Sequence, residues 1–288
     1  MTGRTELLRF FLDKSKNKFS ILSSYFYRKD TLMNRLQDKV AIITGASSGV
    51  GKCIAESFAA EGAKVMLFAR KENLLTEIVN DIKAKGGEAS FLAGSVTDQK
   101  AVEEVFKKTV DAYGKVDIVV NDAGIGGYYG AADVPDKECY DLFDTNAMGS
   151  MRFVREGLKY MLPNKKGVFV FIGSVGGLLG HAGAAYALSK GAMVNLARQV
   201  AVEYHLEGIR SNAICPDGIM TPFIYDFEAD TWKNTCEEHV VKATTGHICA
   251  GTPLCQPEEV ASLALFLASD ESSAVNGQAI VCDHGANL

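Results

Sequence analysis

The sequence predicts an α/β fold in which a mainly parallel sheet is flanked by helices on both faces. Two observations support this prediction: short apolar runs alternate with segments of helical periodicity from residue 38 onward, and a glycine-punctuated run, TGASSGVG, joins the first apolar run to the first helical segment. A chain of 288 residues is long enough for one large domain with a substantial core, which we assign to residues 38–288.

Seven short apolar runs are the strand candidates. They are Val40–Thr44, Val65–Ala69, Ser90–Ala93, Ile118–Asn121, Val168–Gly173, Ser211–Cys215 and Ala279–Cys282. The segments between them, such as KCIAESFAAEGA and KAVEEVFKKTVDAYGK, place apolar residues at helical spacing. Because strands that alternate with helices pair in parallel, the pattern predicts a single doubly wound, Rossmann-type domain with seven strands.

The first 37 residues differ in composition from the rest of the chain. Residues 1–39 carry nine Lys/Arg and four Asp/Glu, and apolar residues recur there at near-helical spacing. We therefore predict a basic amphipathic arm over residues 1–37. Packing on the body or on another subunit, contact with a membrane surface or acidic partner, and a cleaved targeting segment all stay open as its role.

Composition argues against several classes of protein. The net charge is −5, with an acidic body that would repel nucleic acid, and the longest apolar runs fall far short of a membrane span. The seven scattered cysteines are typical of reduced thiols in a cytoplasmic protein. A zinc ion could be held by Cys236, His239, His247, Cys249 and Cys255, but no two of these residues have the spacing of the ligand pairs in zinc fingers. We predict no metal site.

The run TGASSGVG predicts a turn that binds a pyrophosphate. Gly45, Gly49 and Gly51 follow a strand and open a helix, so the chain can turn tightly and a phosphate can approach its backbone. The free N–H groups at the start of the helix attract negative charge. A structural turn without a ligand is the alternative.

The residues after the second strand bear on the identity of the cofactor. An acidic residue there would accept hydrogen bonds from the ribose hydroxyls of NAD, but this sequence has Ala69 followed by Arg70 and Lys71. A guanidinium can bind a 2′-phosphate through two charge-assisted hydrogen bonds. The sequence therefore favours NADP(H), with NAD(H) as the alternative.

Four motifs in this order resemble those of the short-chain dehydrogenase/reductase family. TGASSGVG resembles its TGxxxGxG, VVNDAG its NNAG, YALSK its YxxxK and CPDGIMT its PGxxxT, and the resemblance covers residues 36 to 288. It implies hydride transfer between a nicotinamide and the carbinol carbon of a secondary alcohol or ketone. Hydroxysteroid or bile-acid-like substrates are candidates, as are smaller ketones and acyl-chain ketones.

By motif, the catalytic residues are Asn146, Ser174, Tyr186 and Lys190. Residues i and i+4 share a helix face, so Lys190 can hold its ammonium near Tyr186 and is expected to lower the pKa of the phenol, making it a general acid and base. Ser174, at a strand end, could hydrogen-bond the substrate oxygen. The resemblance implies that Lys190 also binds the nicotinamide ribose and that Asn146 supports Lys190 through a water.

The predicted binding residues lie in the loops after the strands. The cofactor contacts are Gly45, Ser47, Ser48, Gly49, Val50, Gly51, Arg70, Lys71, Ser95, Val96, Asn121, Ala123, Gly124, Tyr186, Lys190, Pro216, Ile219 and Thr221. The predicted substrate contacts are His181 and Phe223, the latter in a lid over residues 221–255 whose aromatic side chains suit an apolar substrate. Relatives are commonly tetramers or dimers, so a homo-oligomer is expected, and the apolar stretch GAMVNLARQVAVEY could form its interface or be buried in its own subunit.

Four positions depart from the family pattern. Asp122 replaces the second Asn of NNAG, Ser95 replaces an Asp, Asp217 replaces the Gly of the PG motif, and His284 interrupts a C-terminal DGG-like turn. Asp217 could pair with a neighbour or with the substrate, or be tolerated by the backbone. Because fold alone does not guarantee activity, a catalytically silent dinucleotide-binding regulatory protein stays as the alternative function.

Overall fold

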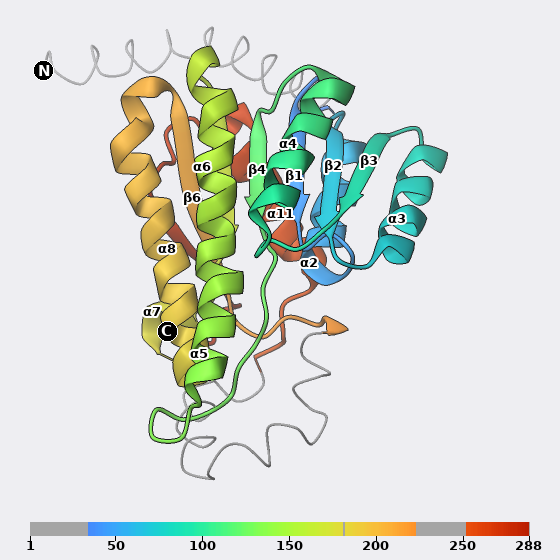
Figure 1. The fold of residues 1–288 in the computed structure, drawn as a ribbon. Helices are drawn as coiled ribbons and strands as arrows, with labels where there is room; N and C mark the ends of the chain where they lie inside the picture. The colour runs from blue at the N-terminus through green and yellow to red at the C-terminus, as the bar shows by residue number, and fades with distance from the viewer. Residues whose placement is uncertain (1–33, 181, 223–251, 288) are drawn as a thin grey trace, which may run out of the picture. The chain divides into compact units, whose positions relative to one another are not determined.

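A seven-stranded parallel sheet forms the centre of the structure (Figure 1). The computed structural model describes residues 34–180, 182–222 and 252–287, so most of the predicted arm lies outside the described residues. The strands are β1 (Val40–Thr44), β2 (Lys64–Ala69), β3 (Glu88–Ala93), β4 (Ile118–Asn121), β5 (Gly167–Ile172), β6 (Ile209–Pro216) and β7 (Ala279–Cys282), in the order β3-β2-β1-β4-β5-β6-β7. The predicted doubly wound fold is confirmed, and all six strand pairs are parallel.

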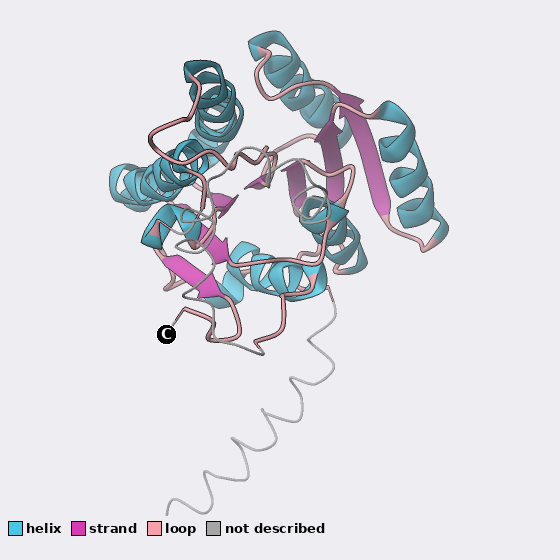
Figure 2. Cartoon of the chain, turned by 90° about the horizontal axis from the view of Figure 1, so that it is seen from below, coloured by secondary structure: helices cyan, strands magenta, loops and turns pink. Residues whose placement is uncertain are grey.

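The central strands β1, β4 and β5 are almost entirely apolar and buried because helices cover both faces of the sheet. Successive side chains point to opposite faces, so Ala41 and Ile43 of β1 enter one core and Ile42 enters the other. Helices α2 (Gly49–Ala60), α3 (Glu72–Ala84) and α11 (Pro257–Ala268) pack in the first core. Helices α4 (Gln99–Tyr113), α6 (Gly149–Met161) and α8 (Ala184–Tyr204) pack in the second, and Figure 2 shows the strands between the two layers.

Short helical segments lie between the main elements. They are α5 (Asp136–Leu142), the π-helix η1 (Phe143–Met148) and α7 (Gly176–Leu179), together with the 3-10 turns η2 (Leu162–Asn164), η3 (His205–Glu207) and η4 (Asp270–Ser272). The helix α5 continues through η1 into α6, so the three segments form one helical run interrupted by a π-turn.

The topology of the sheet has a switch point between β1 and β4. From β1 the chain passes to β2 on one side, while β4 pairs with β1 on the other, so the strand order reverses between β1 and β4. In open parallel sheets ligands bind at this point, outside the carboxyl ends of the strands. The loops after β1, β4, β5 and β6 are therefore where the predicted site residues should meet.

No helix among the described residues is long and apolar enough to cross a membrane.

The five described cysteines form no disulfide with one another. They are Cys53, Cys139, Cys215, Cys255 and Cys282, whereas Cys236 and Cys249 lie outside the described residues.

Candidate active site

The glycine loop after β1 lies directly against the turn after β4. A Cβ atom on Gly45 would lie 2.8 Å from Asp122 Oδ2 and 2.9 Å from the Ala123 nitrogen, and Gly45 has a φ of +69°. A Cβ on Gly51 would lie 2.6 Å from Asp122 Oδ2. Both positions therefore require glycine, because a side chain would push the loop away from β4 and widen the turn at which α2 begins.

Thr44 fixes the junction between β1 and β4. Its Oγ1 accepts hydrogen bonds from the backbone nitrogens of Asp122 and Ala123, both at 3.0 Å, and donates to the Val120 oxygen at 3.2 Å. Thr44 was not among the predicted site residues. The signal was present, since a buried threonine at the end of an apolar strand needs partners for its hydroxyl.

Asp122 places a carboxyl group beneath the glycine loop. The carboxylate accepts a hydrogen bond from the Gly51 backbone N–H, and the residue as a whole is partly exposed. Burial of the carboxyl raises its pKa to about 7, an effect that the nearby ammonium of Lys190 partly offsets. The departure from the family motif thus introduces a group that titrates near neutral pH.

Asn146 lies on the π-helix η1 and is fully buried. Its Oδ1 accepts from the Ile125 nitrogen at 2.9 Å, and its Nδ2 donates to the Ile125 oxygen at 3.0 Å and to Ser189 Oγ at 2.9 Å. Asn146 therefore joins the loop after β4 to α8, the helix that carries the Tyr/Lys pair. π-turns of this kind frequently occur at functional sites.

Lys190 and Tyr186 lie on the same face of α8, as their spacing predicts. Lys190 Nζ lies 5.8 Å from the centre of the Tyr186 ring and donates to the Ile172 oxygen at the end of β5 at 2.8 Å. Burial lowers the pKa of Lys190 to about 8. Gly124 separates Lys190 from Asn146, since a Cβ there would lie 3.2 Å from Asn146 Oδ1 and 3.4 Å from Lys190 Nζ.

The pKa of Tyr186 differs from the expectation. Burial raises the pKa of the phenol to about 12, and a hydrogen bond with Ser174 offsets only part of that effect. The prediction that Lys190 lowers this pKa was wrong for the structure, because desolvation dominates and the ammonium is held by the Ile172 carbonyl. Ser174 itself accepts from the Gly176 nitrogen at 3.0 Å, which orients its hydroxyl toward the helix that follows β5.

The remaining predicted cofactor residues lie at or after the carboxyl ends of the strands. Ser47 and Ser48 lie in the glycine loop after β1, and Val50 lies in the first turn of α2. Arg70 and Lys71 are exposed after β2, and Ser95 and Val96 follow β3. Pro216 ends β6, and Ile219 and Thr221 follow that strand. Thr221 closes over the glycine loop, because its Cγ2 lies 3.3 Å from the Cβ position of Gly49. Ser95 Oγ and Thr97 Oγ1 lie 2.8 Å apart, so Ser95 forms a local turn where the family usually has an acid.

The predicted substrate contacts and the departure at Asp217 have different outcomes. His181, Phe223 and most of the proposed lid lie outside the described residues. Asp217 is described, and its Oδ2 accepts from Asn287 Nδ2 at 3.1 Å, so this departure from the family pattern pairs with a neighbour in the C-terminal turn.

The residues present fit a dinucleotide. The loop between β1 and α2 packs so closely on the turn after β4 that Gly45 and Gly51 leave no room for a side chain, and it ends at the N-terminus of α2, where backbone N–H groups can attract a phosphate. Asn121, at the carboxyl end of β4, is buried, and neither its Oδ1 nor its Nδ2 has a hydrogen-bond partner among the described residues. Buried polar atoms without partners are rare in proteins. A glycine turn at a helix N-terminus, beside a Ser, Tyr, Lys and Asn cluster, is the arrangement expected of a nucleotide-dependent oxidoreductase.

Comparison with known proteins agrees with this class. A family model described as Enoyl-(Acyl carrier protein) reductase matches residues 45–287. A 3beta-hydroxysteroid dehydrogenase of Mediterraneibacter gnavus is 33% identical over 88% of this chain and 96% of its own length. A 3-oxoacyl-[acyl-carrier-protein] reductase of Thermotoga maritima is 33% identical over 87% of this chain and 98% of its own.

A solved structure shares the fold. The crystal structure of gox2181 is 31% identical, with a TM-score of 0.80 over 88% of this chain and 96% of its own. The chain belongs to the short-chain dehydrogenase/reductase family, whose members are oxidoreductases with an NAD(P)-type cofactor.

Proposed function

We propose that this protein transfers a hydride between NADP(H) and a secondary alcohol or ketone, with Tyr186 as the general acid and base. The observation that supports this proposal is the meeting of Tyr186, Ser174 and Lys190 at the carboxyl end of β5, next to the turn after β4 on which the glycine loop packs. The nicotinamide, when bound, supplies or accepts the hydride.

The chain's own residues handle the proton and the substrate oxygen. The phenol of Tyr186 is protonated at neutral pH, so it can donate to a carbonyl oxygen as that oxygen gains negative charge. Ser174, already hydrogen-bonded to Tyr186, stabilises the same oxygen. Lys190 places a positive charge close to the phenol. Asn146 joins the loop after β4 to α8 through hydrogen bonds to Ile125 and Ser189, which fixes the helix that carries Tyr186 and Lys190. Alcohol oxidation runs these proton transfers in reverse.

The choice of NADP(H) depends on the residues after β2. Arg70 is exposed at the point where the strand ends, and no acidic residue stands between it and β2. We expect Arg70→Ala to weaken NADPH binding by about 10-fold to 100-fold and NADH binding hardly at all, because hydrogen bonds to a charged group contribute about 1.5–3 kcal/mol each. Lys85→Ala, which removes an exposed cation at the end of α3, is the matched control. Equal losses for the two cofactors would refute this assignment.

The substrate class is best tested with both cofactors together. A relative named as a 3beta-hydroxysteroid dehydrogenase supports a hydroxysteroid or bile-acid-like alcohol, and one named as a 3-oxoacyl-[acyl-carrier-protein] reductase supports an acyl-chain ketone. A panel of steroid alcohols, steroid ketones, 3-oxoacyl thioesters and small ketones is assayed by nicotinamide absorbance. Turnover on the steroid members supports the first class. Absence of turnover on every member would favour the catalytically silent binding protein.

A homo-oligomer is also proposed, on the basis of exposed apolar side chains. The stretch GAMVNLARQVAVEY packs largely within its own subunit, since Met193, Val194 and Ala197 are buried in the second core. By contrast, Tyr140 on α5 is 72% exposed and Leu188 on α8 is 62% exposed. These two helices pack on each other, and we propose that their exposed apolar side chains contact a second copy of the chain.

A further inference from the structure

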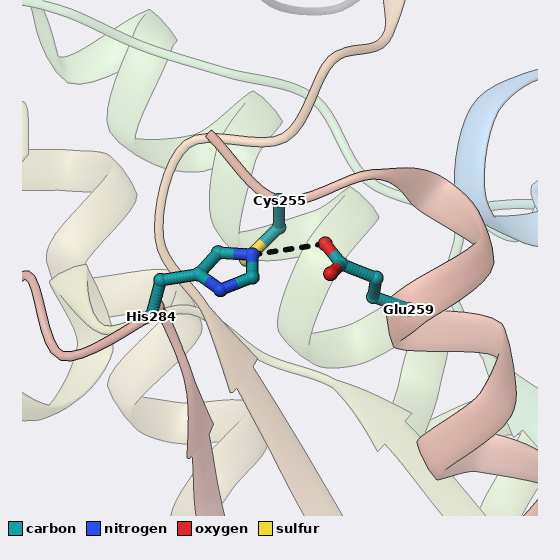
Figure 3. A group of neighbouring side chains, drawn as sticks. All are labelled: Cys255, Glu259 and His284. Atoms are coloured by element: carbon teal, nitrogen blue, oxygen red, sulfur yellow. Dashed lines mark hydrogen bonds and ion pairs between the residues drawn. The ribbon is translucent and has the colours of Figure 1, made fainter. Parts of the chain in front are cut away.

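Three side chains that the proposed reaction does not use come together near the C-terminal end of the chain (Figure 3). Cys255 precedes α11, Glu259 lies in the first turn of α11, and His284 follows β7. One ligand atom from each, a thiol sulfur, a carboxylate oxygen and an imidazole nitrogen, lies within 4.8 Å of the other two. Segments 25 residues apart in the sequence thus converge on one point.

We propose that Cys255, Glu259 and His284 form a binding site for a zinc-like divalent cation. Sulfur, imidazole nitrogen and carboxylate oxygen are the three donor types that zinc uses in proteins. Donor atoms around a tetrahedral zinc lie about 3.5 Å apart, so the three groups need to close by only about 1 Å. His284 Nε2 and Glu259 Oε2 are already 3.0 Å apart, and their side chains are 36% and 43% exposed, which leaves them free to adjust.

The backbone at His284 supports a functional role for this side chain. Its φ is +52°, the left-handed region that favours glycine, and the family usually has a glycine-rich turn here. A histidine at such a position costs stability relative to glycine. The hydrogen bond between His284 and Glu259 offsets part of that cost, and ligation of a cation by the three groups would offset more of it.

The site would link the start of α11 and the end of β7 to the segment after β6. The backbone of Cys255 pairs with the segment after β6, since its nitrogen donates to the Gly218 oxygen and its oxygen accepts from the Met220 nitrogen, both at 2.9 Å. That segment includes predicted cofactor contacts. Binding breaks the S–H bond of Cys255, which now donates to the Cys282 oxygen at 3.2 Å, forms a metal–sulfur bond and releases the proton to solvent. A solvent water completes the coordination.

The competing explanation assigns each side chain a local structural role. Glu259 Oε2 accepts from the Gln256 nitrogen at 2.8 Å as part of a capping box, and it pairs with His284. Glu259→Gln separates the two explanations, because glutamine still serves a capping box but is a far weaker ligand than a carboxylate. His284→Gly removes the imidazole and suits the left-handed backbone, so this variant should fold at least as well as the parent.

The test is a titration of the reduced, chelator-treated full-length chain with Co²⁺, followed by displacement with Zn²⁺. We expect one Co²⁺ per chain, with the near-ultraviolet absorption of a cobalt–thiolate bond, and a rise in the thermal midpoint with Zn²⁺. Glu259→Gln and His284→Gly should each weaken binding by at least about 10-fold, and Cys255→Ser should abolish the thiolate band.

Two controls keep the result specific. Cys139→Ser and His205→Ala alter a cysteine and a histidine outside the cluster and should leave the titration unchanged. Absence of saturable Co²⁺ binding by the parent chain would overturn the proposal. So would binding that persists unchanged in Glu259→Gln and His284→Gly, since the ion would then be held by other residues.

Discussion

Replacement of Asp122 by asparagine should stabilise the protein, and by an amount that grows with pH. An asparagine at this position can still accept the Gly51 N–H through its side-chain oxygen, so the contact beneath the glycine loop is retained. What the substitution removes is a carboxyl group that the fold holds in its neutral form up to about pH 7.

The magnitude follows from the difference in proton binding between the folded and unfolded states. Burial raises the pKa of Asp122 from 3.8 to about 7, so between these values the folded chain holds a proton that the unfolded chain has released. Stability therefore falls as pH rises through this window. At 1.36 kcal/mol per pKa unit, the cost is about 2 kcal/mol near pH 5 and about 4 kcal/mol near pH 8.

Two features make these figures upper limits. Asp122 is partly exposed, so solvent screens its charge. In addition, the charged carboxylate of Asp122 attracts the ammonium of Lys190, whose pKa is about 8. The asparagine variant loses this attraction. The gain at pH 8 should still exceed the gain at pH 5, because only the ionised carboxylate is penalised.

The assay is urea unfolding of parent and variant near pH 5 and pH 8, with Asp81→Asn as control. Asp81 is an exposed carboxylate on α3, so its removal should change the free energy of unfolding by less than about 0.5 kcal/mol at both pH values. A stabilisation by Asp122→Asn that is equal at the two pH values would refute the argument, since an uncharged packing effect has no pH dependence. Destabilisation at pH 8 would refute it as well.

Three further predictions concern catalysis, the site's framework and assembly. Tyr186→Phe should lower kcat by at least about 100-fold and leave the Kd of the cofactor within a factor of about three, because the variant loses the proton donor and keeps the ring. Retained turnover would exclude Tyr186 as the general acid. Asn146→Ala should lower the free energy of unfolding in urea by about 3 kcal/mol, because Ile125 and Ser189 lose their hydrogen bonds to the buried Asn146 side chain. A loss below about 1 kcal/mol would contradict this structural role of Asn146. Tyr140→Lys should lower the molecular mass measured by light scattering without lowering Tm, since the Tyr140 side chain is 72% exposed. An unchanged mass would exclude Tyr140 from the interface between subunits.

The sheet was predictable because parallel strands buried on both faces are written as continuous apolar runs. Every strand was assigned within two residues of its observed ends, as β6 illustrates with a predicted Ser211–Cys215 and an observed Ile209–Pro216. The start of α2 was harder, because the helix begins at Gly49 inside the glycine motif and glycine is a poor helix former.

The catalytic cluster was predictable where it depended on local geometry and was missed where it depended on packing. A spacing of four residues on a helix sets Tyr186 and Lys190 on one face whatever surrounds them. The π-turn that buries Asn146 and the Ile172 carbonyl that holds Lys190 arise only when distant segments pack. The direction of the Tyr186 pKa was missed for the same reason, because desolvation is a property of the folded surroundings.

The glycine loop that first indicates a cofactor also shows how Asp122 enters the chemistry of the site. A helix N-terminus attracts a pyrophosphate through its free N–H groups, but the Gly51 N–H is already donated to Asp122. An ionised carboxylate at this point would compete with the incoming phosphate both for that donor and through its charge. A neutral carboxyl, which the fold favours below about pH 7, reduces the charge repulsion. The position where the family usually has asparagine therefore affects the loop through its charge, while the backbone contact that shapes the loop is the same for both residues.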